Sequence, residues 1–130
     1  MRTTIVAAAF IVMLASVLGC GSDSNDIVKP KPSREHFKRV QMQDNVFSPV
    51  DLVISVGDTV QWENVGSNPH TSTSGAGCTA DALWNSGTLS SGQKFMAIFD
   101  ASHINQTGAL PYFCTFHCVL NMKGTVTVNP

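Results

Sequence analysis

The sequence predicts an all-β fold, a sandwich or a barrel, for the part of the chain that follows residue 36. Three observations lead to this prediction. Short runs rich in β-branched and aromatic residues recur along the chain, turns of Gly, Pro, Asn and Ser separate them, and no segment after residue 19 keeps a helical period. Residues 59–65 alternate strictly, so that Val60, Trp62 and Asn64 share one face, as expected of a half-buried strand.

Each expected strand is a short run bounded by turn-forming residues. The expected strands are residues 37–42, 52–56, 59–65, 94–99, 112–114 and 124–128. Residues 46–49 predict a turn with an apolar anchor, and residues 72–82 predict a loop with one helical turn at its end. Among the aromatic residues, Trp62, Phe95 and Phe99 are expected in the core.

The beginning of the chain predicts export. Residues 1–4 make a short start with one basic residue, Arg2. Residues 5–18 form an apolar run that is too short to span a bilayer comfortably but fits the hydrophobic region of a signal peptide. The Val-Leu-Gly-Cys that ends at Cys20 resembles the lipobox of bacterial lipoproteins, which implies cleavage before Cys20 and a lipid on its thiol. An ordinary secretory signal is the alternative, and in both cases the chain is exported.

These features divide the chain into three parts. Residues 1–19 are the predicted signal peptide, residues 20–36 carry the lipid-bearing cysteine and a polar, Pro-containing tether, and residues 37–130 form one domain. Loss of the signal peptide removes one cation, Arg2, and no anion, so the formal charge changes from −1 to −2. Because the charges are sparse and form no basic patch, nucleic acid is not an expected partner. A monomer is the default expectation for a single domain of this class.

The chemistry of the chain is concentrated near its end. Cys114, His117 and Met122 follow one another with the spacing Cys-x2-His-x4-Met, just before the last predicted strand. A thiolate, an imidazole and a thioether are soft or borderline ligands. One further imidazole would complete a His2Cys set with a weak axial Met, which is the ligand set of a mononuclear blue-copper site. His70, which follows Pro69 in a polar loop, is the candidate for that imidazole.

Other assignments of these residues fit less well. Cys114 and Cys118 have the spacing of the two bridging thiolates in a binuclear copper domain, but that site needs a histidine after the second cysteine, and none follows Cys118. A zinc site is disfavoured because the thioether of Met122 is a poor zinc ligand. His36, in the tether, and His103, in a polar loop, are expected to be solvated bystanders.

The four cysteines each need a role in an oxidising compartment. If Cys20 carries lipid and Cys114 binds metal, Cys78 and Cys118 remain as a pair. We therefore expect a Cys78–Cys118 disulfide, which would tie the segment after His70 to the metal-binding loop.

From residue 37 to residue 130 the chain resembles the cupredoxins, and within them the plastocyanin-like and pseudoazurin-like proteins. The matching pieces are residues 47–49, 56–64, 69–70, 112–117 and 122–128. The resemblance implies a Greek-key β-sandwich of about eight strands that holds one type 1 copper ion at one end. Carried over to this sequence, it implies strong equatorial ligation by His70, Cys114 and His117, and a long axial bond from Met122.

Two positions depart from the resembled family. Thr71 follows the first histidine, where the family often has an Asn that braces the ligand loops, and Phe116 stands where many plastocyanins have Pro. Neither change removes a ligand. Both bear on the stiffness of the loops and on the reduction potential, because residues around the ligands orient them and tune the metal.

The resemblance implies an electron carrier that passes single electrons between redox proteins, and not an enzyme. The sequence shows no nucleophile–base pair, no paired carboxylates and no open metal position. His117 would be the electron gateway, and an apolar rim around it would favour brief encounters with redox partners. The expected rim residues are Phe47, Pro49, Phe116, Val119 and Leu120.

Two other classes of function remain open from the sequence. One is a periplasmic protein that binds or delivers copper without redox turnover, and the other is a copper-free interaction domain on the same fold. The complete ligand set argues against the copper-free domain. A closed site that contains a cysteine ligand holds copper tightly, which favours electron transfer over copper delivery.

Overall fold

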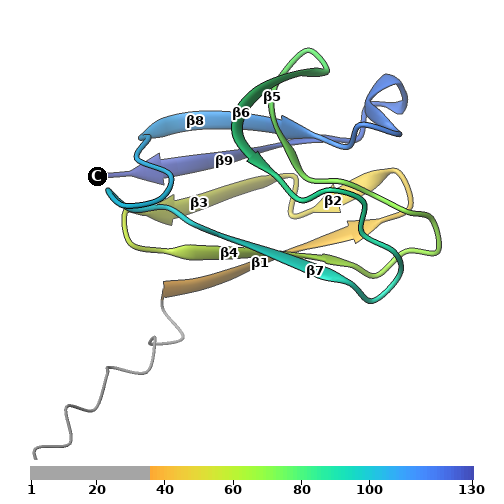
Figure 1. The fold of residues 1–130 in the computed structure, drawn as a ribbon, viewed down its shortest axis with the longest axis horizontal. Helices are drawn as coiled ribbons and strands as arrows, with labels where there is room; N and C mark the ends of the chain where they lie inside the picture. The colour runs from red at the N-terminus through yellow and green to blue at the C-terminus, as the bar shows by residue number, and fades with distance from the viewer. Residues whose placement is uncertain (1–35) are drawn as a thin grey trace, which may run out of the picture.

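A computed structural model describes residues 36–130 (Figure 1). The predicted signal peptide, the lipid site at Cys20 and the tether up to residue 35 lie outside the described residues and stay predictions. Within residues 36–130, no helix is long and apolar enough to cross a membrane.

Two β-sheets pack face to face as a sandwich (Figure 1). The first sheet has four strands, in the order β2 (Val46–Ser48), β1 (Phe37–Gln43), β4 (Thr59–Asn64) and β7 (Lys94–Ile98). The second sheet has five strands, in the order β3 (Asp51–Ser55), β9 (Lys123–Asn129), β8 (Gly108–Phe113), β5 (Thr73–Ala76) and β6 (Thr79–Asn85). A short 3₁₀ turn, η2 (Cys118–Leu120), lies between β8 and β9. The predicted all-β sandwich is confirmed, with nine strands in the described residues.

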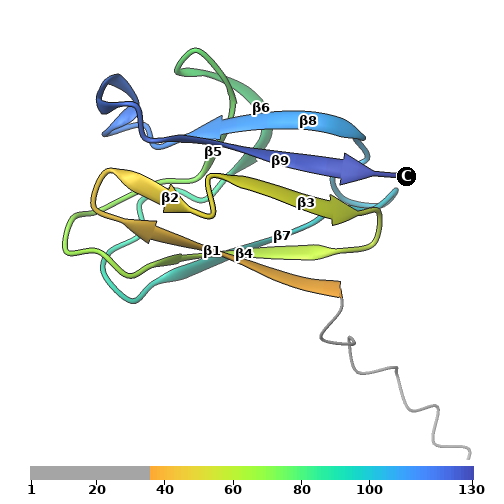
Figure 2. The ribbon, with the colours of Figure 1, turned by 180° about the vertical axis from the view of Figure 1, so that it is seen from behind.

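Both sheets mix parallel and antiparallel pairs. β1 pairs with β4 in parallel and β3 pairs with β9 in parallel, whereas the other neighbours are antiparallel. Parallel neighbours cannot be joined by a tight hairpin, so the chain crosses between the sheets. As a result, the segments that follow β4 and β8 meet at one end of the sandwich, opposite the chain's C-terminus (Figure 2).

The core is built around Trp62 on β4, which is completely buried. Its strand neighbours in register are Val40 on β1 and Phe95 on β7. Across the sandwich its ring lies 5.7 Å from that of Tyr112 and 5.6 Å from that of Trp84. Trp62 and Phe99 are in the core as expected, and Phe95 packs against it while partly exposed.

The prediction for residues 72–82 was wrong, because this segment contributes two strands, β5 and β6, and no helical turn. Its buried side chains are polar, and two of them find their hydrogen-bond partner in Trp84, further along β6. The Ser72 hydroxyl accepts a hydrogen bond from the Trp84 indole at 2.9 Å, and the Ser74 hydroxyl accepts one from the Trp84 backbone at 2.9 Å. A strand whose inward side chains are Ser and Thr shows no apolar alternation, so the pattern on which the prediction relied was missing.

Gly124 illustrates how tightly the end of the sandwich is packed. It lies opposite Tyr112 in the β8–β9 register, and the Tyr112 ring covers it. A Cβ atom at this position would lie 2.5 Å from the ring carbon Cζ and 2.7 Å from the Val50 carbonyl oxygen. The position therefore has room only for glycine unless its neighbours move.

We expect Gly124→Ala to lower the free energy of unfolding by about 1–3 kcal/mol, because the added methyl overpacks the core. Urea unfolding of the metal-free protein measures this change. Thr127→Ala, on the same strand but partly exposed, is the matched control and should stay within about 0.5 kcal/mol. Equal stability of the two variants would contradict the packing role of Gly124.

Candidate metal centre

Three predicted ligands come together at the end of the sandwich. His70 lies in the segment after β4, Cys114 directly follows β8, and His117 lies in the loop before β9. The two imidazole Nδ1 atoms are 3.2 Å apart. The Cys114 Sγ atom lies 3.8 Å from Nδ1 of His70 and 3.5 Å from Nδ1 of His117.

These distances fit one metal ion. From the three separations of 3.2, 3.5 and 3.8 Å, a point equidistant from the three atoms lies about 2.0 Å from each, near the usual lengths of metal–nitrogen and metal–sulfur bonds. One cation at that point would satisfy the lone pairs of both facing ring nitrogens and the thiolate. A thiolate with two imidazoles in a nearly planar group is a set that suits copper.

Met122 is also at this end, and it is completely buried. Its carbonyl accepts a hydrogen bond from the Cys114 N–H at 3.1 Å, and its own N–H donates to the His117 carbonyl at 3.1 Å. These two bonds close the loop from Cys114 to Met122 on itself. They place the Met122 backbone beside two ligand residues, while its role as the axial ligand stays a prediction.

Backbone bonds also stiffen the interior of this loop. The His117 N–H donates to the Cys114 carbonyl at 3.2 Å, and the Leu120 N–H donates to the His117 carbonyl at 2.9 Å. Asn121 ends η2 in the left-handed conformation, with φ of 67°. The loop therefore holds its shape through its own backbone.

Thr71 joins the two ligand segments. Its N–H points to the Cys114 sulfur at 3.4 Å, and its hydroxyl accepts a hydrogen bond from the Thr115 N–H at 2.8 Å. The Thr73 hydroxyl donates to the same oxygen at 3.2 Å. A threonine thus braces the ligand loops at the position where the resembled family often has Asn.

The imidazole of His70 is completely buried. Burial, and after it the charge of the neighbouring His117, lower the pKa of His70 below its ordinary value, while Asp44 opposes the shift. The ring is therefore neutral near pH 7 and offers a lone pair to a metal. Its Nε2 atom lies 3.6 Å from a carboxylate oxygen of Asp44. Asp44 could not be singled out from the sequence, because nothing in the sequence distinguishes it from an ordinary solvated aspartate in a turn.

A disulfide joins Cys78 and Cys118, with a Cα–Cα distance of 5.9 Å. Cys78 lies in the β5–β6 turn, and Cys118 directly follows His117. Among the described residues, Cys114 is the cysteine that remains free. The disulfide thus ties the hairpin to the metal-binding loop and leaves one thiol for the metal.

The other two described histidines lie away from the ligand cluster. His36 pairs with Asp58 at 2.9 Å and His103 pairs with Asp100 at 2.8 Å, and both histidine side chains are more than half exposed. Neither belongs to the group of ligand atoms that the structure brings together. Both are surface residues with a carboxylate partner.

One residue of the expected apolar rim was placed wrongly. Phe47 is only 1% exposed, and its ring packs 4.6 Å from that of Tyr112 inside the sandwich. The sequence pattern could not show this, because an aromatic residue beside a predicted turn can point either way. Phe116, Val119 and Leu120 are exposed as expected.

Comparison with known proteins identifies the family. Residues 35–129 match the family described as copper binding proteins, plastocyanin/azurin family. The chain belongs to this family. The plastocyanin of Scenedesmus fuscus is 35% identical over 90 residues, which cover 65% of this chain and 87% of that protein.

Solved structures agree with this assignment. A purple cupredoxin from Nitrosopumilus maritimus is similar with a TM-score of 0.62 and 30% identity, over 71% of this chain and 99% of that one. The reduced form of an amicyanin variant is similar with a TM-score of 0.57 and 28% identity, over 70% and 80% of the two chains. The cupredoxin fold is thereby confirmed, and with it the cofactor of the family, one type 1 copper ion.

We expect the double substitution Cys78→Ser with Cys118→Ser to lower the free energy of unfolding by about 4 kcal/mol, because the 40-residue separation leaves a long loop unconstrained in the unfolded chain. Urea unfolding of the metal-free protein measures the loss. The reference is the parent protein under non-reducing conditions. Its intact mass should show one disulfide. A parent with two modifiable thiols in addition to Cys114 would contradict the disulfide.

Proposed function

We propose that this cupredoxin is an exported, lipid-anchored blue-copper protein that passes single electrons between larger redox proteins. The convergence of one thiol and two imidazole nitrogens around a point about 2.0 Å from each carries the proposal. In this proposal His70, Cys114 and His117 are the equatorial ligands and Met122 is the axial ligand. Membership of the plastocyanin/azurin family supports the same role.

The protein's own residues make such a site suitable for electron transfer. Copper, when bound, supplies a one-electron couple between Cu(II) and Cu(I). His70 and Cys114 are completely buried and keep water from that side of the site. The closed loop from Cys114 to Met122, and the bond between Thr71 and Thr115, hold the ligands in place. A site held in this way rearranges little, and little rearrangement favours fast electron transfer.

The route for electrons is proposed to pass through His117, the one partly exposed residue of the cluster. Phe116, Val119 and Leu120, which we call the apical patch, stand beside it and are 50%, 88% and 61% exposed. An exposed apolar patch of this kind suits a short-lived contact, because such encounters bury little area and separate quickly. Redox proteins are therefore the proposed partners.

The proposal of export has support from inside the domain. Disulfides form and persist in oxidising compartments and are rare in reducing ones. The Cys78–Cys118 bridge therefore agrees with the predicted signal peptide. Attachment to a membrane rests on the lipobox-like stretch that ends at Cys20.

The absorption spectrum of residues 21–130, titrated with Cu(II) and then reduced, tests the copper role. We expect an intense blue band that ascorbate bleaches, because a short thiolate–copper bond gives strong charge transfer. Cys114→Ser should lose the band, and His103→Ala, at an exposed histidine, should keep it. A pale solution with weak bands would reject the electron-carrier role and favour copper delivery or a metal-free domain.

The rate of electron self-exchange tests the apical patch. We expect Leu120→Asp to lower the second-order rate constant about tenfold without changing the absorption spectrum, because two like charges then meet in the encounter complex. NMR line broadening in mixtures of oxidised and reduced protein measures this rate.

The matched control for this test is Val53→Asp. Val53 on β3 is 60% exposed, nearly the same as Leu120, and it lies on the sheet surface away from the metal-binding loop. The Val53→Asp variant should leave the self-exchange rate constant unchanged, apart from the small effect of the added net charge. Equal slowing by both variants would reject contact through the apical patch.

A further inference from the structure

One buried nitrogen of the metal centre has no hydrogen-bond partner within the described residues. It is Nε2 of His70. An imidazole that binds a metal through Nδ1 carries its proton on Nε2, so this atom becomes a buried donor once a metal is bound. The charged group beside it is the Asp44 carboxylate, whose Oδ1 lies 3.6 Å away.

Asp44 is held in place by the same segment that carries His70. It lies in the turn between β1 and β2, and its Oδ1 accepts hydrogen bonds from the N–H groups of Ser67 at 3.0 Å and Asn68 at 3.1 Å. A side chain at Gly66 would place its Cβ 2.5 Å from this oxygen, so glycine is what permits the close approach. Asp44 is partly exposed, so its carboxyl group is ionised near neutral pH as an ordinary aspartate is.

We propose that Asp44 is a positioning residue of the copper centre, which accepts the Nε2–H of His70 and favours Cu(II) over Cu(I) through its negative charge. The inference rests on the proposed function, since it requires copper at His70. By fixing Nε2, the carboxylate keeps Nδ1 of the same ring turned toward Cys114 and His117. The Asp44 side chain is 44% exposed, so solvent screens part of its charge and its effect on the copper is moderate.

Asp44→Asn is the decisive variant. It has nearly the same shape and keeps an oxygen that accepts the Ser67 and Asn68 N–H groups, but it removes the charge. Loss of a partner of a metal-binding imidazole typically lowers metal affinity about 10- to 100-fold. Because the lost charge favours Cu(II), we expect the ratio of Cu(II) to Cu(I) affinity to fall about tenfold, which corresponds to a rise of about 59 mV in reduction potential. Voltammetry of the copper-loaded protein measures the potential.

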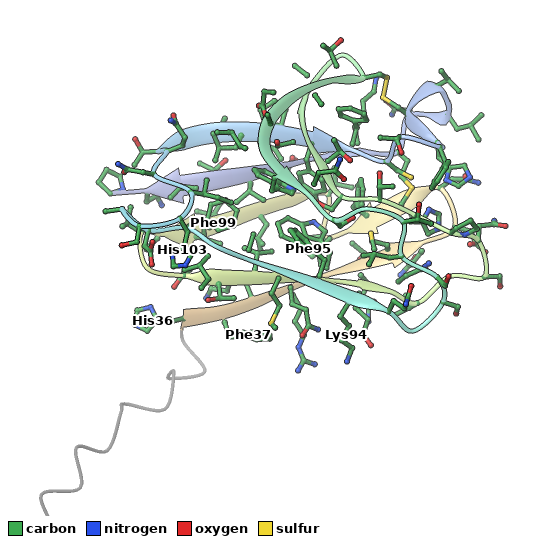
Figure 3. All side chains as sticks on the ribbon, viewed as in Figure 1. His36, Phe37, Lys94, Phe95, Phe99 and His103 are labelled. Atoms are coloured by element: carbon green, nitrogen blue, oxygen red, sulfur yellow. A yellow bond between two sulfur atoms is a disulfide. The ribbon has the colours of Figure 1, made fainter. Side chains whose placement is uncertain are left out.

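Asp100 offers a matched control. Its Oδ1 accepts the N–H groups of Ser102 at 2.8 Å and His103 at 2.9 Å, and it lies 2.8 Å from Nδ1 of the His103 ring. It therefore repeats the local chemistry of Asp44 at the opposite end of the sandwich from the metal-binding loop, where Figure 3 labels His103. Asp100→Asn removes the same charge and should leave the potential unchanged.

A second measurement needs no variant. In the diamagnetic Cu(I) protein, the Nε2 proton of His70 should give a downfield NMR signal that exchanges slowly with water, because it is buried against the carboxylate. Rapid exchange of this proton in the parent protein would overturn the proposal even if Asp44→Asn does not fold. A shift of the signal in Asp44→Asn, together with the raised potential, would support it.

The outcomes separate this inference from the function on which it rests. A parent protein with a blue copper band, in which Asp44→Asn keeps the parent potential, overturns the role of Asp44 and leaves the electron carrier intact. Lower stability of the variant with an unchanged potential also overturns that role, since Asp44 would then only brace the loop. A parent protein that forms no blue site with added Cu(II) overturns both proposals.

Discussion

The contact between Thr71 and the segment Cys114–Thr115 is the interaction on which the rest of the metal centre depends. One hydroxyl oxygen and one N–H of Thr71 hold the two ligand-bearing parts of the chain together, at 2.8 Å to the Thr115 N–H and 3.4 Å to the Cys114 sulfur. These parts are 44 residues apart in sequence. Because the contact joins these two parts directly, hydrogen bonds within the protein hold the two imidazoles and the thiol close together.

The sandwich supplies the stiffness behind that contact. Pairing between β8 and β9 brackets the metal-binding loop, and the Cys78–Cys118 disulfide adds a covalent tie one residue after His117. On the other side, the Asp44 carboxylate fixes the segment that leads to His70. Interfaces built from packed strands and satisfied polar groups resist continuous deformation, which suits a site that must keep one geometry in two oxidation states.

Much of the fold and of the centre could be predicted because the signals are local. The alternation around Trp62 predicted a core strand, and Cys114, His117 and Met122 lie together on one short loop with a recognisable spacing. Prediction failed where the local signal was absent. The strand β5 was missed because its inward side chains are Ser and Thr, and the polar groups of Ser72 and Ser74 gain their partner, Trp84 on β6, only in the folded chain.

The sequence by itself determined the kinds of donor atom, the spacing of three of them and the all-β pattern, since these follow from residue identity and order. Tertiary structure decided how closely His70 approaches the other ligands, that Phe47 turns inward, and that Asp44 stands 3.6 Å from the far nitrogen of His70. These facts depend on how the sheets cross and pack. A strand pattern specifies which residues share a face, but only closure of the sandwich brings residues of distant turns within contact distance.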